Sequence, residues 1–459
     1  MAQVCLKPGT LRCYPPMPLS GSAAKGYSVF DSESDMSVEY ENGLLRNPLQ
    51  VFLQVVLAFL IGVSLRLVLL PEALAADDSK PSKVDFLIYF GVFKAFSDLL
   101  GGNLADLWGR KRTCSLGWAV GMTIAPVLYF ADRAESLALT NVANILTGSS
   151  QGLIWGLNII CLMDILGPQG RGLASALSNA VGYFGSAVTA PVAGHVIASV
   201  DGGRDLCLGA LVASTLLGLL LTLVAKDTRL WAPAEEAVGL QWPRSGCASE
   251  AQVLCSLAGH TVNAATALVW GATLLWVKGL GGFSVAGASD LEGWFTANKV
   301  LAMLLSGCVS YWIGRQQLVA AVALVMLALG LAALSWQAHR PPADWPMMLL
   351  STALIGAGVG AAFPALAATV TDGLPQRSRA SVYGAYRMWR DLGYAGGGLV
   401  TRLTSGSFET TTVFVAAWSA GIAGAFGCRL VLVSRCREAR EEAEGDSSRT
   451  SSDTCSGSE

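Results

Sequence analysis

Residues 102–112 read Gly102-Asn-Leu-Ala-Asp106-Leu-Trp-Gly109-Arg110-Lys111-Arg112, a short charged stretch between two long apolar blocks. Gly102 permits close contact between membrane helices, because glycine has no side chain to hold them apart. Gly109 interrupts the helix, and the three basic residues after it are typical of the cytoplasmic ends of membrane helices. Asp106, at a helix end, can pair with a base or with a helix N-terminus. The stretch therefore predicts a cytoplasmic turn between two membrane-spanning helices.

The composition of the whole chain is that of a membrane protein. Of its 459 residues, 53% are hydrophobic and 14% are charged, against roughly 25% charged in a soluble domain. The net charge of −2 argues against a nucleic-acid-binding protein, which would carry a basic surplus. The sequence contains no phosphate-binding loop, no nucleophile elbow and no His/Cys metal cluster. We therefore expect neither an enzyme nor a cofactor or metal site.

Twelve apolar blocks are long enough to cross a membrane as helices, which takes about 20 residues each. They lie at about 49–70, 84–105, 113–131, 140–165, 172–199, 206–225, 252–277, 291–312, 318–336, 347–370, 380–402 and 408–434. Lys and Arg concentrate in the loops on one side, which predicts that this side and both termini are cytoplasmic.

The blocks divide the chain into five segments. We expect a disordered cytoplasmic N-terminal segment (1–46), an N-terminal six-helix half (47–225), a cytoplasmic linker (226–251), a C-terminal six-helix half (252–434) and a disordered cytoplasmic tail (435–459). The first segment lacks the early apolar run of a signal peptide, and the tail is charged and rich in serine.

An internal repeat relates the two halves. Residues 90–110 match 295–315 at an offset of 205, with seven identities that include Phe90/Phe295 and Lys94/Lys299. At an offset of 208, Gly148 and Gly152 match Gly356 and Gly360. A lysine inside a span costs about 2.5–3.5 kcal/mol to insert, so the matched lysines are a strong signal. Parallel repeats place a solute site between the halves near mid-membrane, with alternating access by rocking.

Charged residues inside the spans form the candidate site, because charges there are expensive and usually functional. They are Lys94, Asp98, Lys299, Arg387, Arg390 and Asp391. Local pairs four residues apart, Lys94 with Asp98 and Arg387 with Asp391, leave Lys299 and Arg390 without a partner in their own helices. The surplus of two positive charges favours an anion, and arginine suits carboxylate or phosphate. The alternative is that these charges pair across helices and only hold the bundle together.

Polar and aromatic residues supply further candidates. Gln151, Trp155 and Asn158 share one face of the fourth span, and His260, Asn263 and Trp270 lie on the seventh. We assign Gln151, Trp155, Asn158, Asn263 and Trp270 to substrate binding. His260, a titratable imidazole, joins Asp98 and Asp391 as a candidate for proton coupling or gating. For each single residue, packing between helices is the competing interpretation.

The stretch 102–112 resembles the signature loop of the major facilitator superfamily, which has Gly, three residues, Asp, two residues, Gly and then basic residues. With the spans and the repeat, the resemblance covers about 47–434. It implies an all-α membrane protein of twelve helices in two parallel six-helix repeats. It also implies a loop that latches the two halves through Gly102, Asp106, Gly109, Arg110, Lys111 and Arg112. Residues 386–395, with Lys94 and the 164–171 loop, resemble a largely bacterial, poorly characterised branch.

We therefore expect a monomeric secondary active transporter, embedded in a lipid bilayer and in the plasma membrane rather than an internal membrane. Its solute would be small and anionic, or would bear carboxyl or phosphate groups, and its transport would be coupled to protons or proceed by exchange. One alternative is an exporter of drug-like compounds, although proton-coupled exporters of the family usually carry an arginine where this chain has Asn144. An alternative of another class is a non-transporting membrane sensor, which the short polar termini disfavour.

Overall fold

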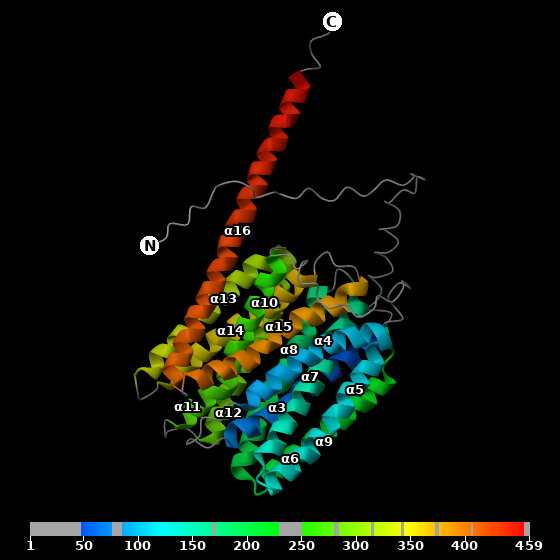
Figure 1. Ribbon diagram of the computed structural model, residues 1–459, viewed down its shortest axis with the longest axis vertical. Coiled ribbons are helices and arrows are strands. Elements are labelled where there is room, and N and C mark those ends of the chain that lie inside the picture. Colours follow the sequence, from blue (N-terminus) through cyan, green and yellow to red (C-terminus); the bar gives the residue numbers. More distant parts are fainter. Residues whose placement is uncertain are drawn as a thin grey trace, which may run out of the picture. The chain divides into compact units, whose positions relative to one another are not determined.

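The computed structural model describes residues 47–75, 85–167, 171–228, 250–279, 284–313, 316–340, 344–371, 376–404 and 407–453, and these are helical apart from short turns (Figure 1). The first half comprises α3 (Pro48–Ala75), α4 (Asp85–Trp108), α5 (Arg110–Met122), α6 (Ile124–Arg133), α7 (Leu137–Leu166), α8 (Arg171–Ser199) and α9 (Gly203–Val224). The second half comprises α10 (Glu250–Leu268), the π-helical turn η3 (Val269–Thr273), α11 (Leu274–Gly279), α12 (Val285–Ile313), α13 (Gln316–Ala338), α14 (Trp345–Thr371), α15 (Gln376–Leu403) and α16 (Phe408–Asp453).

These helices correspond one to one with the predicted spans. The third span consists of α5 and α6, and the seventh consists of α10, η3 and α11. Nine spans in the described part of the chain are long and apolar enough to cross a membrane. The other three, α4, α12 and α15, have 24, 29 and 28 residues, which is long enough to span the bilayer. These three helices carry the charges of the predicted site.

The three charged helices lie where the two halves meet. α4 packs along α15, and α12 packs along α8. Glycines set the close approach, with Gly91 against Ala395 and Gly102 against Gly384 in the first pair. The second pair has matching contacts at its two ends, Gly194 with Ser289 and Gly307 with Ala176. The two helices of each pair, which come from different halves, therefore touch near both ends. We call these two contacts, α4 with α15 and α8 with α12, the seams, and both are closed.

The predicted repeat has a direct structural counterpart. Matched glycines of α7 and α14 lie against matched backbone positions of α4 and α12: Gly148 at Phe90, Gly152 at Lys94, Gly356 at Phe295 and Gly360 at Lys299. Each contact is so close that a side chain at the glycine would overlap the neighbouring backbone. The same helix-to-helix contact is thus built twice, which confirms the parallel repeat and its register.

The carboxyl end differs from the prediction. Residues 435–453 continue α16 as a helix, whereas their composition predicted disorder. The sequence spaces Arg437 and Arg440 four residues before Glu441 and Glu444, a spacing that stabilises helices. Residues 1–46 and 454–459 and most of the linker 226–251 lie outside the described residues.

Candidate functional site

A network of buried charges joins the two halves at mid-bundle. Asp391 of α15 is its centre and accepts hydrogen bonds from Arg390 Nε at 2.6 Å and Arg387 Nη2 at 3.4 Å. Asn263 Nδ2 of α10 also donates to it, at 2.7 Å, and Lys94 of α4 pairs with it from the other half. One carboxylate is therefore held by four donors, three of them cationic.

Asp98 of α4 completes this network. It accepts from Lys94 Nζ at 3.1 Å and from Arg387 Nε at 2.7 Å. Both predicted local pairs are present, and they are joined by pairs across the halves. The prediction that Arg390 lacks a partner in its own helix is wrong, because it pairs with the adjacent Asp391. A cavity of about 10 Å3 borders Asp98 and Arg387, barely room for one water, so side chains fill this region.

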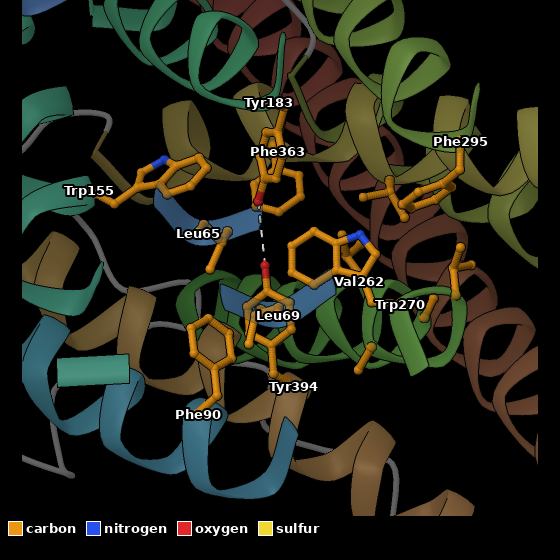
Figure 2. Close-up of a cluster of buried hydrophobic side chains, with 14 of the residues drawn as sticks. Leu65, Leu69, Phe90, Trp155, Tyr183, Val262, Trp270, Phe295, Phe363 and Tyr394 are labelled. Carbon is orange, nitrogen blue, oxygen red and sulfur yellow. Dashed lines mark hydrogen bonds between the residues drawn. The ribbon is translucent and has the colours of Figure 1, made fainter. Parts of the chain in front are cut away.

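Lys299 of α12 has a different environment from its repeat partner Lys94. Its side chain is fully buried, and among the described residues its Nζ has no hydrogen-bond partner. Three rings surround the ammonium instead: their centroids lie 3.5 Å away at Tyr183, 4.7 Å at Phe363 and 5.7 Å at Trp270. Such cation–π contacts partly replace hydration. We call these three rings the aromatic cage (Figure 2).

The aromatic cage connects Lys299 to the charged network. The Arg390 guanidinium lies 4.9 Å from the Phe363 ring centroid, so the Phe363 ring contacts both Lys299 and Arg390. Tyr394 stacks on Trp270 at 5.5 Å between centroids, and its hydroxyl lies 3.4 Å from that of Tyr183, as the dashed line in Figure 2 marks. Rings from both halves thus meet beside the unpaired ammonium.

A further buried ion pair was not among the predicted site residues. Arg66 of α3 pairs with Glu292 of α12, and neither side chain is exposed. The Arg66 guanidinium also lies 4.8 Å from the centroid of the Trp270 ring. Both residues fall inside predicted spans, so their charge was the signal that could have found them. The middle of the described bundle then holds five bases (Arg66, Lys94, Lys299, Arg387, Arg390) and three acids (Asp98, Glu292, Asp391), and the surplus of two positive charges remains.

The loop 102–112 forms the turn between α4 and α5. Gly109 has a φ of 99°, a conformation that favours glycine. Arg110 Nη1 donates to Asp106 Oδ1 at 2.8 Å, and its Nε lies 3.4 Å from Asp164 Oδ2 at the end of α7. Lys111 Nζ donates to the Leu223 carbonyl of α9 at 2.6 Å. These contacts tie the loop to its own half.

The opposite half would meet this loop at the start of α15. The side chains of residues 372–381 lie outside the described residues, so the latch between the halves stays a prediction. Arg112 is exposed beside the loop.

Comparison with known proteins assigns this chain to a family. A family model of the Major Facilitator Superfamily matches residues 51–398. The chain belongs to the major facilitator superfamily. It is a multi-pass membrane transporter and not an enzyme.

Solved transporters of this superfamily share the fold. The human organic anion transporter MFSD10 is 18% identical with a TM-score of 0.62, and the match covers 84% of this chain and 99% of that one. The E. coli fucose:proton symporter FucP is 16% identical with a TM-score of 0.58, covering 82% and 97%. The proton:xylose symporter XylE is 12% identical with a TM-score of 0.62, covering 82% and 95%. At these identities the likeness concerns the fold alone.

In this superfamily member, the candidates on α7 pack mainly within the N-terminal half. Gln151 Nε2 donates to Ser64 Oγ at 3.1 Å, and Asn158 Nδ2 donates to Ser178 Oγ at 2.9 Å. The Trp155 ring reaches the aromatic cage, 4.9 Å from Tyr183 between centroids. Of these contacts, the one between Trp155 and Tyr183 reaches the aromatic cage.

Of the three candidates on the seventh span, two lie at the charged network or in the aromatic cage and one does not. Asn263 contacts Asp391 and Trp270 belongs to the aromatic cage. His260 instead faces the backbone of α15, with Nδ1 3.3 Å from the Trp389 carbonyl oxygen and its ring against Gly396. The imidazole therefore packs against a neighbouring helix of its own half.

Proposed function

We propose that this transporter moves a small anionic solute, bearing carboxyl or phosphate groups, by alternating access. The observation that carries the proposal is the buried surplus of two positive charges, with Lys299 lacking any hydrogen-bond partner among the described residues. A buried unpaired cation is costly, and an anion that pairs with it relieves that cost. We expect Lys299 and Arg390, which both contact the Phe363 ring, to bind the anionic group.

Unpartnered donors near this centre support the same chemistry. Among the described residues, the buried donors without a hydrogen-bond partner include Lys299 Nζ, Arg387 Nη1, Trp270 Nε1 and the hydroxyls of Tyr383 and Tyr386. Unsatisfied buried donors favour a ligand that is rich in acceptors, such as a carboxylate or a phosphate. The aromatic cage would contact the less polar part of the solute.

The closed seams suggest how binding relates to transport. In this structure the pairs Asp98–Arg387 and Lys94–Asp391 join the two halves. A solute anion would compete with these carboxylates for the same cations. Exchange of one set of ion pairs for the other would let the halves rock.

The family branch, the coupling, the oligomeric state and the membrane are part of the same proposal. Residues 386–395 with Lys94 support membership in the largely bacterial, poorly characterised branch. We propose coupling to protons or exchange, a monomer, and location in the plasma membrane. The aromatic cage favours one second candidate, export of drug-like compounds, because rings also bind apolar cations once Lys299 is removed from the cage. A membrane sensor that binds solute without moving it is the candidate of another class.

A thermal-shift screen of the purified full-length protein tests the proposal. The ligands are benzoate, succinate, inorganic phosphate, choline and tetraphenylphosphonium, applied to wild type and to Lys299→Met. The exposed Lys226→Met is the matched control. A ligand at 100 times its dissociation constant stabilises by about 2.7 kcal/mol.

We expect stabilisation by anions that is lost in Lys299→Met and kept in Lys226→Met. Stabilisation by the two cations alone, unchanged in Lys299→Met, would overturn the proposal in favour of drug export. Anion binding without flux in proteoliposomes would favour the sensor.

A further inference from the structure

The Arg66–Glu292 pair bridges the two halves at a level of its own. Glu292 lies seven residues before Lys299 on α12, about 10 Å along the helix, toward the end predicted to face outward. The Asp98–Arg387 bridge lies toward the end predicted to face the cytoplasm, because Asp98 is one turn past Lys94, the repeat partner of Lys299. The two bridges therefore stand on opposite sides of the level of the lysines, and Arg66–Glu292 is the outer one.

Glu292 differs from the other two buried acids in how many bases hold it. Asp391 contacts Lys94, Arg387 and Arg390, and Asp98 contacts two bases. Glu292 has one ionic partner in the described part of the chain, Arg66. Neutralising Asp391 would remove a carboxylate contact from three bases, whereas neutralising Glu292 removes one from a single base.

The other charged or titratable groups around Glu292 are few. Its own helix offers Lys299 two turns deeper and Asp290 near the outer end, and Asp290 lies 3.2 Å from His195 of α8. α8 also presents Tyr183, α11 carries Lys278, and Arg390 and Asp391 lie beyond the aromatic cage. The described residues of α13 and α14 have no titratable side chain.

We propose that Glu292 is the proton-binding site of the transporter, and that the anionic group of the solute takes its place beside Arg66. This rests on the proposed anionic solute. When α3 and α12 separate, the pair breaks and the Glu292 carboxylate takes up one proton to become a neutral carboxylic acid. Arg66 keeps its charge and pairs with the solute anion.

The charge balance explains why proton and solute would move together. The empty closed state holds Arg66 with an ionised Glu292, and the loaded closed state holds Arg66 with the solute and a neutral Glu292. The two states have the same net charge, so both can close. A protonated empty transporter would close on an unpaired arginine, which is unfavourable. Proton and solute therefore raise each other's affinity by the same factor, and one proton accompanies each solute molecule.

Infrared difference spectroscopy of the solute-free, full-length protein in lipid tests the proton site directly. Lowering the pH from about 8 to about 5 should produce the carbonyl band of a protonated carboxylic acid. Glu292→Gln should remove that band. Arg66→Gln should show it already at the higher pH, and the control Asp290→Asn should leave it unchanged. A band that persists in Glu292→Gln, or no titrating band in wild type, would overturn the proton site.

Binding measurements separate this proposal from the proposed function. Benzoate and sulfate keep their charge over this pH range. In wild type their affinity should rise at least about tenfold on acidification, the effect of removing one negative charge within about 10 Å of the anion. Glu292→Gln should bind at least about tenfold tighter at high pH and lose the pH dependence. If anion binding depends on Lys299 but Glu292→Gln keeps the pH dependence, the proton site is rejected and the anionic solute is not. The expected infrared band without binding of either anion would reject the anionic solute and leave the proton site standing.

Discussion

Replacing Lys299 with methionine should stabilise the solute-free protein, although the residue lies at the centre of the bundle. The buried ammonium depends on three rings and has no hydrogen-bond partner among the described residues. Removing an ion from water costs several kcal/mol, and a desolvated cation–π contact offsets about 2 kcal/mol of this. Methionine has a similar volume, and its sulfur gains about 0.3–1.5 kcal/mol against a ring. The balance predicts stabilisation of about 1–4 kcal/mol, the range for replacing buried ions by apolar groups.

Thermal denaturation in detergent, followed by tryptophan fluorescence, measures this effect. Lys94→Met is the matched control, because the repeat places it at the same level but Lys94 pairs with Asp98 and Asp391. Losing those charged hydrogen bonds should destabilise by about 1.5–3 kcal/mol. The two variants should therefore shift the melting temperature in opposite directions. If Lys299→Met lowered it as Lys94→Met does, Lys299 would have a stabilising partner and our reasoning about the unpaired ammonium would fail.

Three further predictions concern the scaffold. Asp391→Asn should destabilise the protein by about 3–5 kcal/mol, because it leaves the buried Arg390 without its carboxylate partner, and detergent melting curves would show a large loss. Gly152→Val should cost about 1–3 kcal/mol, since the new Cβ would lie 2.6 Å from Ser97 Cβ. Gly421→Val, with nothing within 4 Å of its Cβ position, should be tolerated, so equal yields of folded protein from both would contradict the packing argument. Gly109→Ala should cost about 1–3 kcal/mol because of the positive φ, and an unchanged melting temperature would show that the turn tolerates a side chain.

The sequence by itself determined the helices and the repeat. Membrane helices satisfy their own backbone hydrogen bonds, so the position of an apolar block defines each span with little help from its neighbours. The matched lysines Lys94 and Lys299 stood out because an intramembrane charge is costly wherever it lies. The tail was the exception: its polar composition indicated disorder, while local charge spacing favoured the helix that continues to Asp453.

The tertiary structure alone decided which charges are paired. Lys94 and Lys299 occupy matching positions, yet one lies between two carboxylates and the other lies in the aromatic cage. Asp98 finds Arg387 on a helix almost 300 residues away, and Arg66 finds Glu292 in the opposite half. Spacing along one helix predicts local partners, but the pairs that join the halves depend on how α3, α4, α12 and α15 face each other. The candidate site is therefore set by helix packing, because a buried charge is stabilised only by groups that the fold brings within a few ångströms.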